Sequence, residues 1–216
     1  MAAVRALTPD VLEADLAMVD PSTLAFDAGQ WISVPFGPKI VRAYSIASSP
    51  RIPATLTLCA DVAPAGPGSQ WFRGLTPGTE VGFKGPLGGF VQEPGDTRRL
   101  LLVAEEIGIV PVRAMLHELA AGDFTRPATL VYWARDAGWL VYDDDLRALA
   151  RRHARFAYHP VTPAEGEAAA AADRLVGDTA GLVAYVTGGE ATIKAVRAAL
   201  MAKGMERRAV KWEKFW

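Results

Sequence analysis

The sequence predicts two domains: an antiparallel β-barrel in residues 1–96, followed by an α/β domain with a parallel sheet in residues 97–216. Two observations carry this prediction. Up to about Thr97 the chain reads as short strands separated by frequent Gly and Pro turns, and after Thr97 strands alternate with helices. A chain of 216 residues that is 50% hydrophobic and 22% charged can bury cores of this size.

The first part shows the period of half-buried strands. In residues 12–18, LEADLAM, apolar positions alternate with Glu13 and Asp15, which is the two-residue period of a strand. Turn segments such as APAGPGS and GPLGG separate the strands, and closely spaced turns favour a small antiparallel barrel. The predicted strands are residues 12–18, 31–36, 42–47 and 55–60.

The second part has the longer period of helices set between buried strands. Pro111 suits the first turn of a helix that Gly122 stops, and Asp143 can cap a second helix. A last helix ends at Gly204, and the Ala-rich residues 163–173 form either a helix or a loose connection. The predicted strands are residues 98–104, 128–134, 155–161 and 181–187, an alternation that predicts a parallel sheet wrapped by helices.

Charge and composition narrow the function. The net charge is −1, which leaves no basic footprint for nucleic acid, and the apolar runs are far shorter than the roughly 20 residues of a membrane span. Residues 1–16 lack the apolar core of a secretory signal, and Cys59 alone can form no intrachain disulfide or multi-cysteine cluster. His117, His153 and His159 show no metal-ligand spacing. We therefore expect a cytoplasmic protein without a metal site, nucleic-acid partner or membrane insertion.

Residues 42–45, RAYS, combine three chemically distinct side chains in one extended segment. Arg42 can hold a phosphate in a bidentate contact, Tyr44 can stack on a flat ring, and Ser45 can hydrogen-bond a ring nitrogen. In a regular strand Arg42 and Tyr44 point to one face and Ser45 to the other. The alternative is an ordinary strand with an exposed arginine.

Residues 66–69, GPGS, form the second element with chemical potential. Gly66 and Gly68 allow the backbone to approach a ligand closely, and Ser69 offers a hydroxyl and an N–H where a helix can start. Such a helix start binds phosphate well. The alternative is a plain Gly/Pro turn.

Seven segments, taken in order, resemble the ferredoxin–NADP reductase superfamily, and the resemblance covers nearly the whole chain. AGQW resembles its Pro-Gly-Gln-Tyr strand entry, RAYS its Arg-x-Tyr-Ser flavin motif, and GPGS its Gly-x-x-Ser pyrophosphate turn. GPLGGF resembles its Gly-Pro-x-Gly-x-Phe barrel exit, and IGIVP the end of its Gly-Gly-Thr-Gly-Ile-Ala-Pro nucleotide loop. YVTGGEATIKAVRAAL takes the place of its Cys-Gly-Pro-Pro segment and helix, and WEKFW is similar to its aromatic tail.

The resemblance implies FAD in the barrel, NAD(P)H in the α/β domain, and hydride transfer from nicotinamide to flavin followed by electron release. By position, Arg42 would contact the FAD phosphates, Tyr44 would stack on the isoalloxazine and Ser45 would lie near N5. The pyrophosphate would be held by Gly66, Gly68 and Ser69. The acceptor would be a ferredoxin-like protein, an oxygenase component or a ferric chelate.

On the nucleotide side, the resemblance implies that Gly108, Pro111 and Gly188 belong to loops that bind NAD(P)H. Thr187 would stand where the family's cysteine meets the nicotinamide. Arg135 follows a strand and can meet a 2′-phosphate, whereas Asp136 can hold a ribose hydroxyl or simply pair with Arg135. The choice between NADH and NADPH therefore stays open.

Two departures from the family concern this nucleotide side. Glu105 and Glu106 replace glycines of the loop, and two carboxylates near a pyrophosphate would repel it by at least about 1 kcal/mol each in water. The second departure is TGGE, residues 187–190, in place of Cys-Gly-Pro-Pro. We therefore expect poor NAD(P)H affinity, unless both glutamate side chains point away into solvent.

The aromatic tail carries one more implied role. Phe215 or Trp216 would cover the flavin face that nicotinamide must reach and act as a gate, with Glu213 near the flavin edge. Burial of the terminal rings against the barrel is the alternative.

Two other functions stay open beside the main interpretation of an FAD-dependent NAD(P)H oxidoreductase. The acidic loop and the GGEA segment are similar to those of siderophore-interacting ferric reductases of the same superfamily. The chain is alternatively a non-catalytic flavoprotein relay or partner subunit that has lost NAD(P)H binding.

Overall fold

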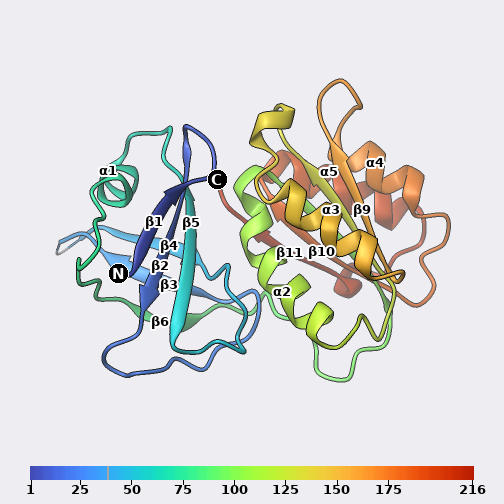
Figure 1. Cartoon of the computed structure of the whole chain (residues 1–216). Coiled ribbons are helices and arrows are strands. Elements are labelled where there is room, and N and C mark those ends of the chain that lie inside the picture. The colour runs from blue at the N-terminus through green and yellow to red at the C-terminus, as the bar shows by residue number, and fades with distance from the viewer. Residues whose placement is uncertain (38) are drawn as a thin grey trace. The chain divides into compact units, whose positions relative to one another are not determined.

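The computed structural model describes residues 1–37 and 39–216, which form two compact units (Figure 1). Unit 1 comprises Met1–Gln92 and Val110–Glu118, and unit 2 comprises Glu93–Ile109 and Leu119–Trp216. Helix α2, Ile109–Ala121, therefore contributes most of its length to unit 1, and its first residue and last turn to unit 2.

Unit 1 contains two antiparallel sheets that share one core. The first sheet has the order β1-β2-β5 (Ala3–Ala6, Val11–Ala17, Thr55–Asp61), and the second has the order β4-β3-β6 (Val41–Ser45, Trp31–Pro35, Lys84–Leu87). An isolated bridge between Ile46 and Leu58 joins the two sheets, and the common core includes Ile32, Leu56 and Phe72. The predicted antiparallel first part is confirmed. Strands β1 and β6 were not expected from the sequence.

Helix α1, Pro67–Arg73, starts directly after Gly66, which is its N-cap residue. Pro67 suits this position because its fixed φ is already helical and its missing N–H would have had no intrahelical partner. Phe72 is fully buried in the core of unit 1 and anchors the helix to the sheets. GPGS, residues 66–69, thus forms the N-cap and the first three residues of the helix and is held in a defined conformation.

Unit 2 is a five-stranded parallel sheet with helices packed on it, as predicted. The strand order is β11-β10-β7-β8-β9, and all four pairings are parallel. The strands are β7 (Arg99–Glu105), β8 (Ala128–Trp133), β9 (Phe156–Val161), β10 (Leu182–Gly188) and β11 (Val210–Lys214). The further helices are α3 (Asp143–Arg152), α4 (Ala168–Leu175) and α5 (Glu190–Ala202), and α4 packs beside α5 over a shared core (Figure 1).

The structure corrects one predicted helix cap and defines two segments that the sequence left open. Asp143 is the first residue of α3 and not its cap, because Tyr142, with φ of 66°, is the N-cap residue. The Asp143 carboxylate instead accepts hydrogen bonds from Arg147 and from the Tyr158 hydroxyl. Helix α4 begins within the Ala-rich segment and ends at Leu175, and the charged tail forms the fifth strand, β11.

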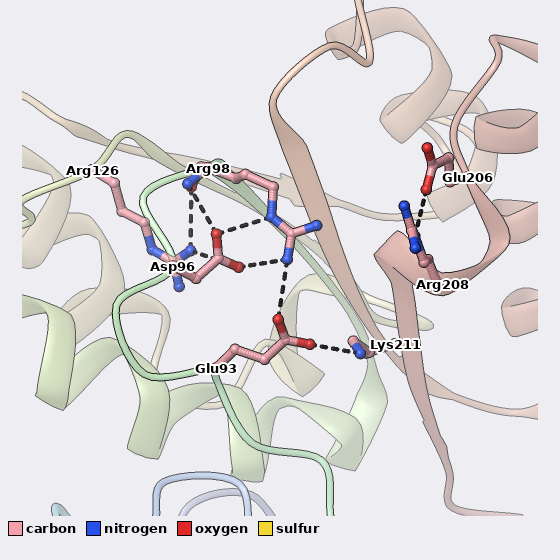
Figure 2. A network of polar contacts seen from close by, with 7 residues as sticks. All are labelled: Glu93, Asp96, Arg98, Arg126, Glu206, Arg208 and Lys211. Atoms are coloured by element: carbon pink, nitrogen blue, oxygen red, sulfur yellow. Dashed lines mark hydrogen bonds and ion pairs between the residues drawn. The ribbon is translucent and has the colours of Figure 1, made fainter.

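A polar network ties the entry of unit 2 to its sheet (Figure 2). Asp96 Oδ2 lies 2.8 Å from Arg98 Nη2 and 3.5 Å from Arg126 Nη1, and its side chain is only 5% exposed. Glu93 extends the network to Lys211 of β11, with Oε1 2.9 Å from Nζ. The Arg98 hydrogen bond lowers the pKa of Asp96 to about 2, so this carboxylate is ionised throughout the physiological range.

Within the described residues, the helices are too short or too polar to cross a membrane. The same part of the chain contains no group of three or more His, Cys, Asp or Glu side chains that could hold a metal ion.

Candidate active site

In unit 1 the RAYS strand and the GPGS turn lie against each other, although 24 residues separate Tyr44 from Gly68. The Tyr44 hydroxyl donates to the Gly68 carbonyl oxygen at 3.3 Å. A Cβ on Gly68 would stand 2.9 Å from the Tyr44 hydroxyl oxygen and 3.2 Å from Arg42 Cγ. Only glycine fits this position without displacing the two side chains, so Arg42, Tyr44 and Gly68 form one cradle.

Tyr44 is held from behind by aromatic rings. Its ring centroid lies 5.5 Å from Trp71 and 5.7 Å from Phe72, both on α1. Phe36 extends the cluster, with its centroid 5.2 Å from Trp71. Burial raises the pKa of the Tyr44 phenol to about 12, so the hydroxyl stays protonated and remains a donor. Trp71 and Phe36 were not predicted as site residues, although an aromatic pair shortly after GPGS is a usable signal for Trp71.

The other predicted residues of this cradle differ in exposure. Arg42 is exposed, and its Nη1 donates to the Val41 carbonyl oxygen at 2.9 Å. Ser45 and Ser69 are both buried. The expected strand alternation fails here, because Tyr44 and Ser45 are both buried at the end of β4, next to the bridge that joins the two sheets. Gly66 differs from Gly68, because a Cβ on Gly66 would meet nothing within 4 Å.

In unit 2 the predicted nucleotide residues gather at the carboxyl ends of β7, β8 and β10. Thr187 is fully buried, and its hydroxyl donates to the Gly108 carbonyl oxygen at 2.8 Å. A Cβ on Gly108 would lie 3.0 Å from this hydroxyl oxygen, so the two loops are closely packed. Pro111, the remaining predicted nucleotide residue, is buried in the first turn of α2 and belongs to unit 1. Ligands of open α/β sheets bind outside this edge.

The two glutamates of the loop point inward and not into solvent. Glu105 Oε2 accepts a hydrogen bond from the Gly189 N–H at 2.7 Å, at the start of α5. Glu106 is buried, and its Oε1 accepts from both the backbone N–H of Arg135, at 2.9 Å, and Arg135 Nε, at 3.0 Å. The Arg135 guanidinium also lies 3.8 Å from the ring centroid of Trp139. Both acids, Arg135 and the TGGE segment stand out in the sequence, but the contacts between them were not predicted.

The tail residues lie beside the same edge. Glu213 pairs in register with Thr187, and burial raises the pKa of the Glu213 carboxyl to about 7. Its Oε2 is buried without a hydrogen-bond partner among the described residues. Phe215 N–H donates to the Gly188 carbonyl oxygen at 3.0 Å, and a Cβ on Gly189 would lie 2.5 Å from Trp216 Nε1. The tail is thus anchored to β10 and to the start of α5.

Comparison with known proteins identifies the family of this chain. Residues 2–91 match the family model of the oxidoreductase FAD-binding domain. A ferredoxin–NADP reductase B from Sorangium cellulosum is 34% identical over 161 residues, which cover 73% of this chain and 66% of that protein. The chain belongs to the ferredoxin–NADP reductase superfamily. This confirms the resemblance drawn from the seven sequence segments.

Other members of the superfamily extend the comparison to the whole fold. The reductase component of propane 2-monooxygenase from Gordonia is 27% identical over 73% of this chain and 46% of its own length. The crystal structure of a cytochrome P450 reductase from Amycolatopsis superposes with a TM-score of 0.88 and 26% identity, covering 99% of this chain and 68% of that one. The chain therefore spans less than two thirds of the length of the two curated relatives.

The cradle of unit 1 fits the FAD of a ferredoxin–NADP reductase superfamily member. The N–H groups of Gly68 and Ser69 lie in the first turn of α1, where helical N–H groups have no intrahelical partner and can bind phosphate oxygens. The open space at Gly66 leaves room for close approach of a ligand. Arg42 adds an exposed guanidinium beside this turn. Two backbone donors and a cation are the groups that a pyrophosphate requires.

Proposed function

We propose that the chain is an FAD-dependent oxidoreductase that oxidises NADH or NADPH and delivers the electrons to a separate acceptor. FAD would occupy residues 1–96 and the nicotinamide nucleotide residues 97–216. When bound, FAD supplies the redox chemistry, since it takes a hydride and gives up electrons to an acceptor. The observation that carries the proposal is the Gly68 turn, which packs on Arg42 and Tyr44 inside a matched FAD-binding domain.

The residues of the chain would bind and orient. Arg42, Gly66, Gly68 and Ser69 would hold the pyrophosphate. Tyr44 would lie against the isoalloxazine, and Ser45 near its N5. On the nucleotide side Gly108, Pro111 and Gly188 would line the loops, and Arg135 would meet a 2′-phosphate if the nucleotide is NADPH. Thr187 would lie at the nicotinamide and Glu213 near the flavin edge. Phe215 or Trp216 would cover the flavin face that the nicotinamide must reach and would act as a gate.

The acceptor is proposed from the relatives. Several of them are named as reductase components of oxygenases, including a terephthalate 1,2-dioxygenase reductase from Comamonas that is 26% identical over 206 residues. This supports an oxygenase component or a ferredoxin-like protein as the partner of this chain. The single cysteine leaves residues 1–216 no multi-cysteine cluster, so within these residues the flavin would be the group that gives up the electrons.

One experiment tests the cofactor and the reaction together. The flavin is released by denaturation and identified by chromatography, and the intact protein is titrated anaerobically with NADH and NADPH. We expect FAD and bleaching of its absorbance by at least one nucleotide. Bound FMN alone would contradict the pyrophosphate role of GPGS. A yellow protein that neither nucleotide bleaches would favour the relay function, which the inward-facing Glu105 also supports.

A pair of glycine variants tests the cradle itself. Gly68→Ala should lower the free energy of unfolding of the flavin-free protein by about 1–3 kcal/mol, because the added Cβ overpacks against Tyr44 and Arg42. Gly66→Ala is the matched control, since its Cβ meets nothing within 4 Å and the flavin-free protein should keep its stability. FAD affinity should nevertheless fall in Gly66→Ala, and unchanged affinity would show that no phosphate approaches this residue.

A further inference from the structure

A carboxylate of the chain itself occupies the start of α5. Glu105 ends β7, and its Oε2 accepts from the N–H of Gly189, the N-cap residue of α5, at 2.7 Å. Gly188 makes room for it: φ is 148°, and a Cβ there would lie 2.6 Å from both Cβ and Oε2 of Glu105. Two consecutive glycines thus admit this side chain to the helix start, where a larger residue would exclude it.

The position of this carboxylate matters because of what the site attracts. The N-terminal end of a helix carries a partial positive charge, and its N–H groups bind phosphates. It lies at the carboxyl edge of the parallel sheet, the place where α/β domains bind nucleotides. Glu105 therefore presents its own negative charge to a donor that a phosphate-bearing ligand would use.

We propose that Glu105 is an autoinhibitory side chain, which the diphosphate of NADH or NADPH must displace from the start of α5 before it binds. The inference rests on the proposed function, which supplies the ligand. Because Glu105 is tethered, its effective concentration at Gly189 stays high at any concentration of protein, and the nucleotide competes against it at every turnover.

Glu106 does not share this role, although it is adjacent. Its carboxylate is buried and receives both the backbone N–H and the Nε of Arg135, at 2.9 and 3.0 Å. Its charge is thereby balanced at the end of β8, away from Gly189 in the order of the sheet. The two acids are separable: Glu106 fixes Arg135, and Glu105 blocks α5.

The test measures binding of ADP-ribose, the non-redox part of the nucleotide, by isothermal titration calorimetry of the FAD-loaded protein. Glu105→Gln keeps the shape of the side chain but leaves only a neutral hydrogen bond, which is roughly half as strong as a charged one. We expect its affinity for ADP-ribose to be about tenfold higher than that of the wild type, the size expected when one charge-assisted hydrogen bond no longer competes. Unchanged or weaker affinity would overturn the proposal.

Glu190→Gln is the matched control. Glu190 lies one residue beyond Gly189 in the first turn of the same helix, but its carboxylate is exposed and paired with Lys194 and Lys214. If Glu105 acts by occupying the Gly189 N–H, Glu190→Gln should change ADP-ribose affinity less than twofold, in keeping with the weakness of exposed ion pairs. An equal gain in both variants would show general charge repulsion instead and would also overturn the proposal.

Two further measurements keep the outcomes distinct. If Glu105→Gln does not fold, Glu105→Asp, which withdraws the carboxylate by one methylene, must show a gain above that of Glu190→Gln, or the proposal fails. If the wild type is bleached by a nucleotide while Glu105→Gln binds ADP-ribose no better, the proposal fails and the proposed function stands. If no variant binds ADP-ribose and none is bleached, both fail.

Discussion

The carboxyl group of Glu213 should make the stability of the protein depend on pH near neutrality. Burial raises its pKa from 4.5 to about 7, and its Oε2 has no hydrogen-bond partner among the described residues. At about 1.4 kcal/mol for each pKa unit, the difference corresponds to about 3 kcal/mol. Because the residue is only half-buried, solvent screening lowers the expected contribution to about 2 kcal/mol.

The sign follows from proton binding. Between pH 4.5 and 7 the folded protein holds a proton on Glu213 that the unfolded chain has released, so the free energy of unfolding falls as the pH rises. The stabilising term is fully present below pH 4.5 and is lost as the pH passes 7. Glu213→Gln, which cannot ionise, should therefore remove this part of the pH dependence.

The assay is urea denaturation of the wild type and of Glu213→Gln at intervals from about pH 5 to pH 8.5. The difference in unfolding free energy between the two proteins should change by about 2 kcal/mol across this range, in favour of the glutamine variant at high pH. Glu206→Gln is the control, since Glu206 is an exposed carboxylate paired with Arg208, and its curve should run parallel to that of the wild type. Parallel curves for Glu213→Gln as well would refute the reasoning.

Three other predictions follow from the described contacts. Asp96→Asn should cost about 2 kcal/mol at pH 7, because the pKa of Asp96 is lowered to about 2 by Arg98; the wild-type advantage, measured by denaturation, should vanish as the pH falls from 3.8 towards 2. Tyr44→Phe should weaken FAD binding about fivefold in a flavin-fluorescence titration, because a hydrogen bond worth about 1 kcal/mol no longer fixes the Gly68 carbonyl, and unchanged affinity would separate Tyr44 from the turn. Deletion of Phe215 and Trp216 should change NAD(P)H affinity and flavin fluorescence while leaving FAD bound; a protein that unfolds would show that the two rings only pack.

The periodic parts of the fold could be predicted from the sequence, and the parts defined by pairing could not. Residues 12–18 and 98–104 carry their own two-residue or continuous apolar pattern, and both became strands. Strand β1 has only four residues, all at least partly exposed, so no pattern marks it. The charged segment VKWEK became β11 because it pairs with β10 at the edge of the sheet, where alternate residues remain in solvent.

The candidate site, too, could be predicted only in part from the sequence. The resemblance to the reductase superfamily was what indicated that RAYS and GPGS would meet, since both segments resemble parts of its flavin site. The resemblance also implied that Glu105 and Glu106 put negative charge into a loop that binds the nucleotide. It could not show where each carboxylate would point, because that depends on backbone geometry: Glu106 has φ of 50°, and its carboxylate reaches Arg135 while that of Glu105 reaches Gly189.

The backbone conformation of Glu106 shows that the acidic side chains also stabilise the loop. A left-handed conformation at a residue other than glycine costs on the order of 1 kcal/mol and persists only where surrounding contacts hold it. At Glu106 the two hydrogen bonds to Arg135 supply that hold. The loop is therefore stabilised by its own acids, and the Glu105 carboxylate also satisfies the Gly189 N–H at the start of α5. Under the proposed autoinhibition, Glu105 takes the place of an anion of the ligand, so nucleotide affinity should depend on how readily Glu105 leaves Gly189 and not on the net charge of the loop.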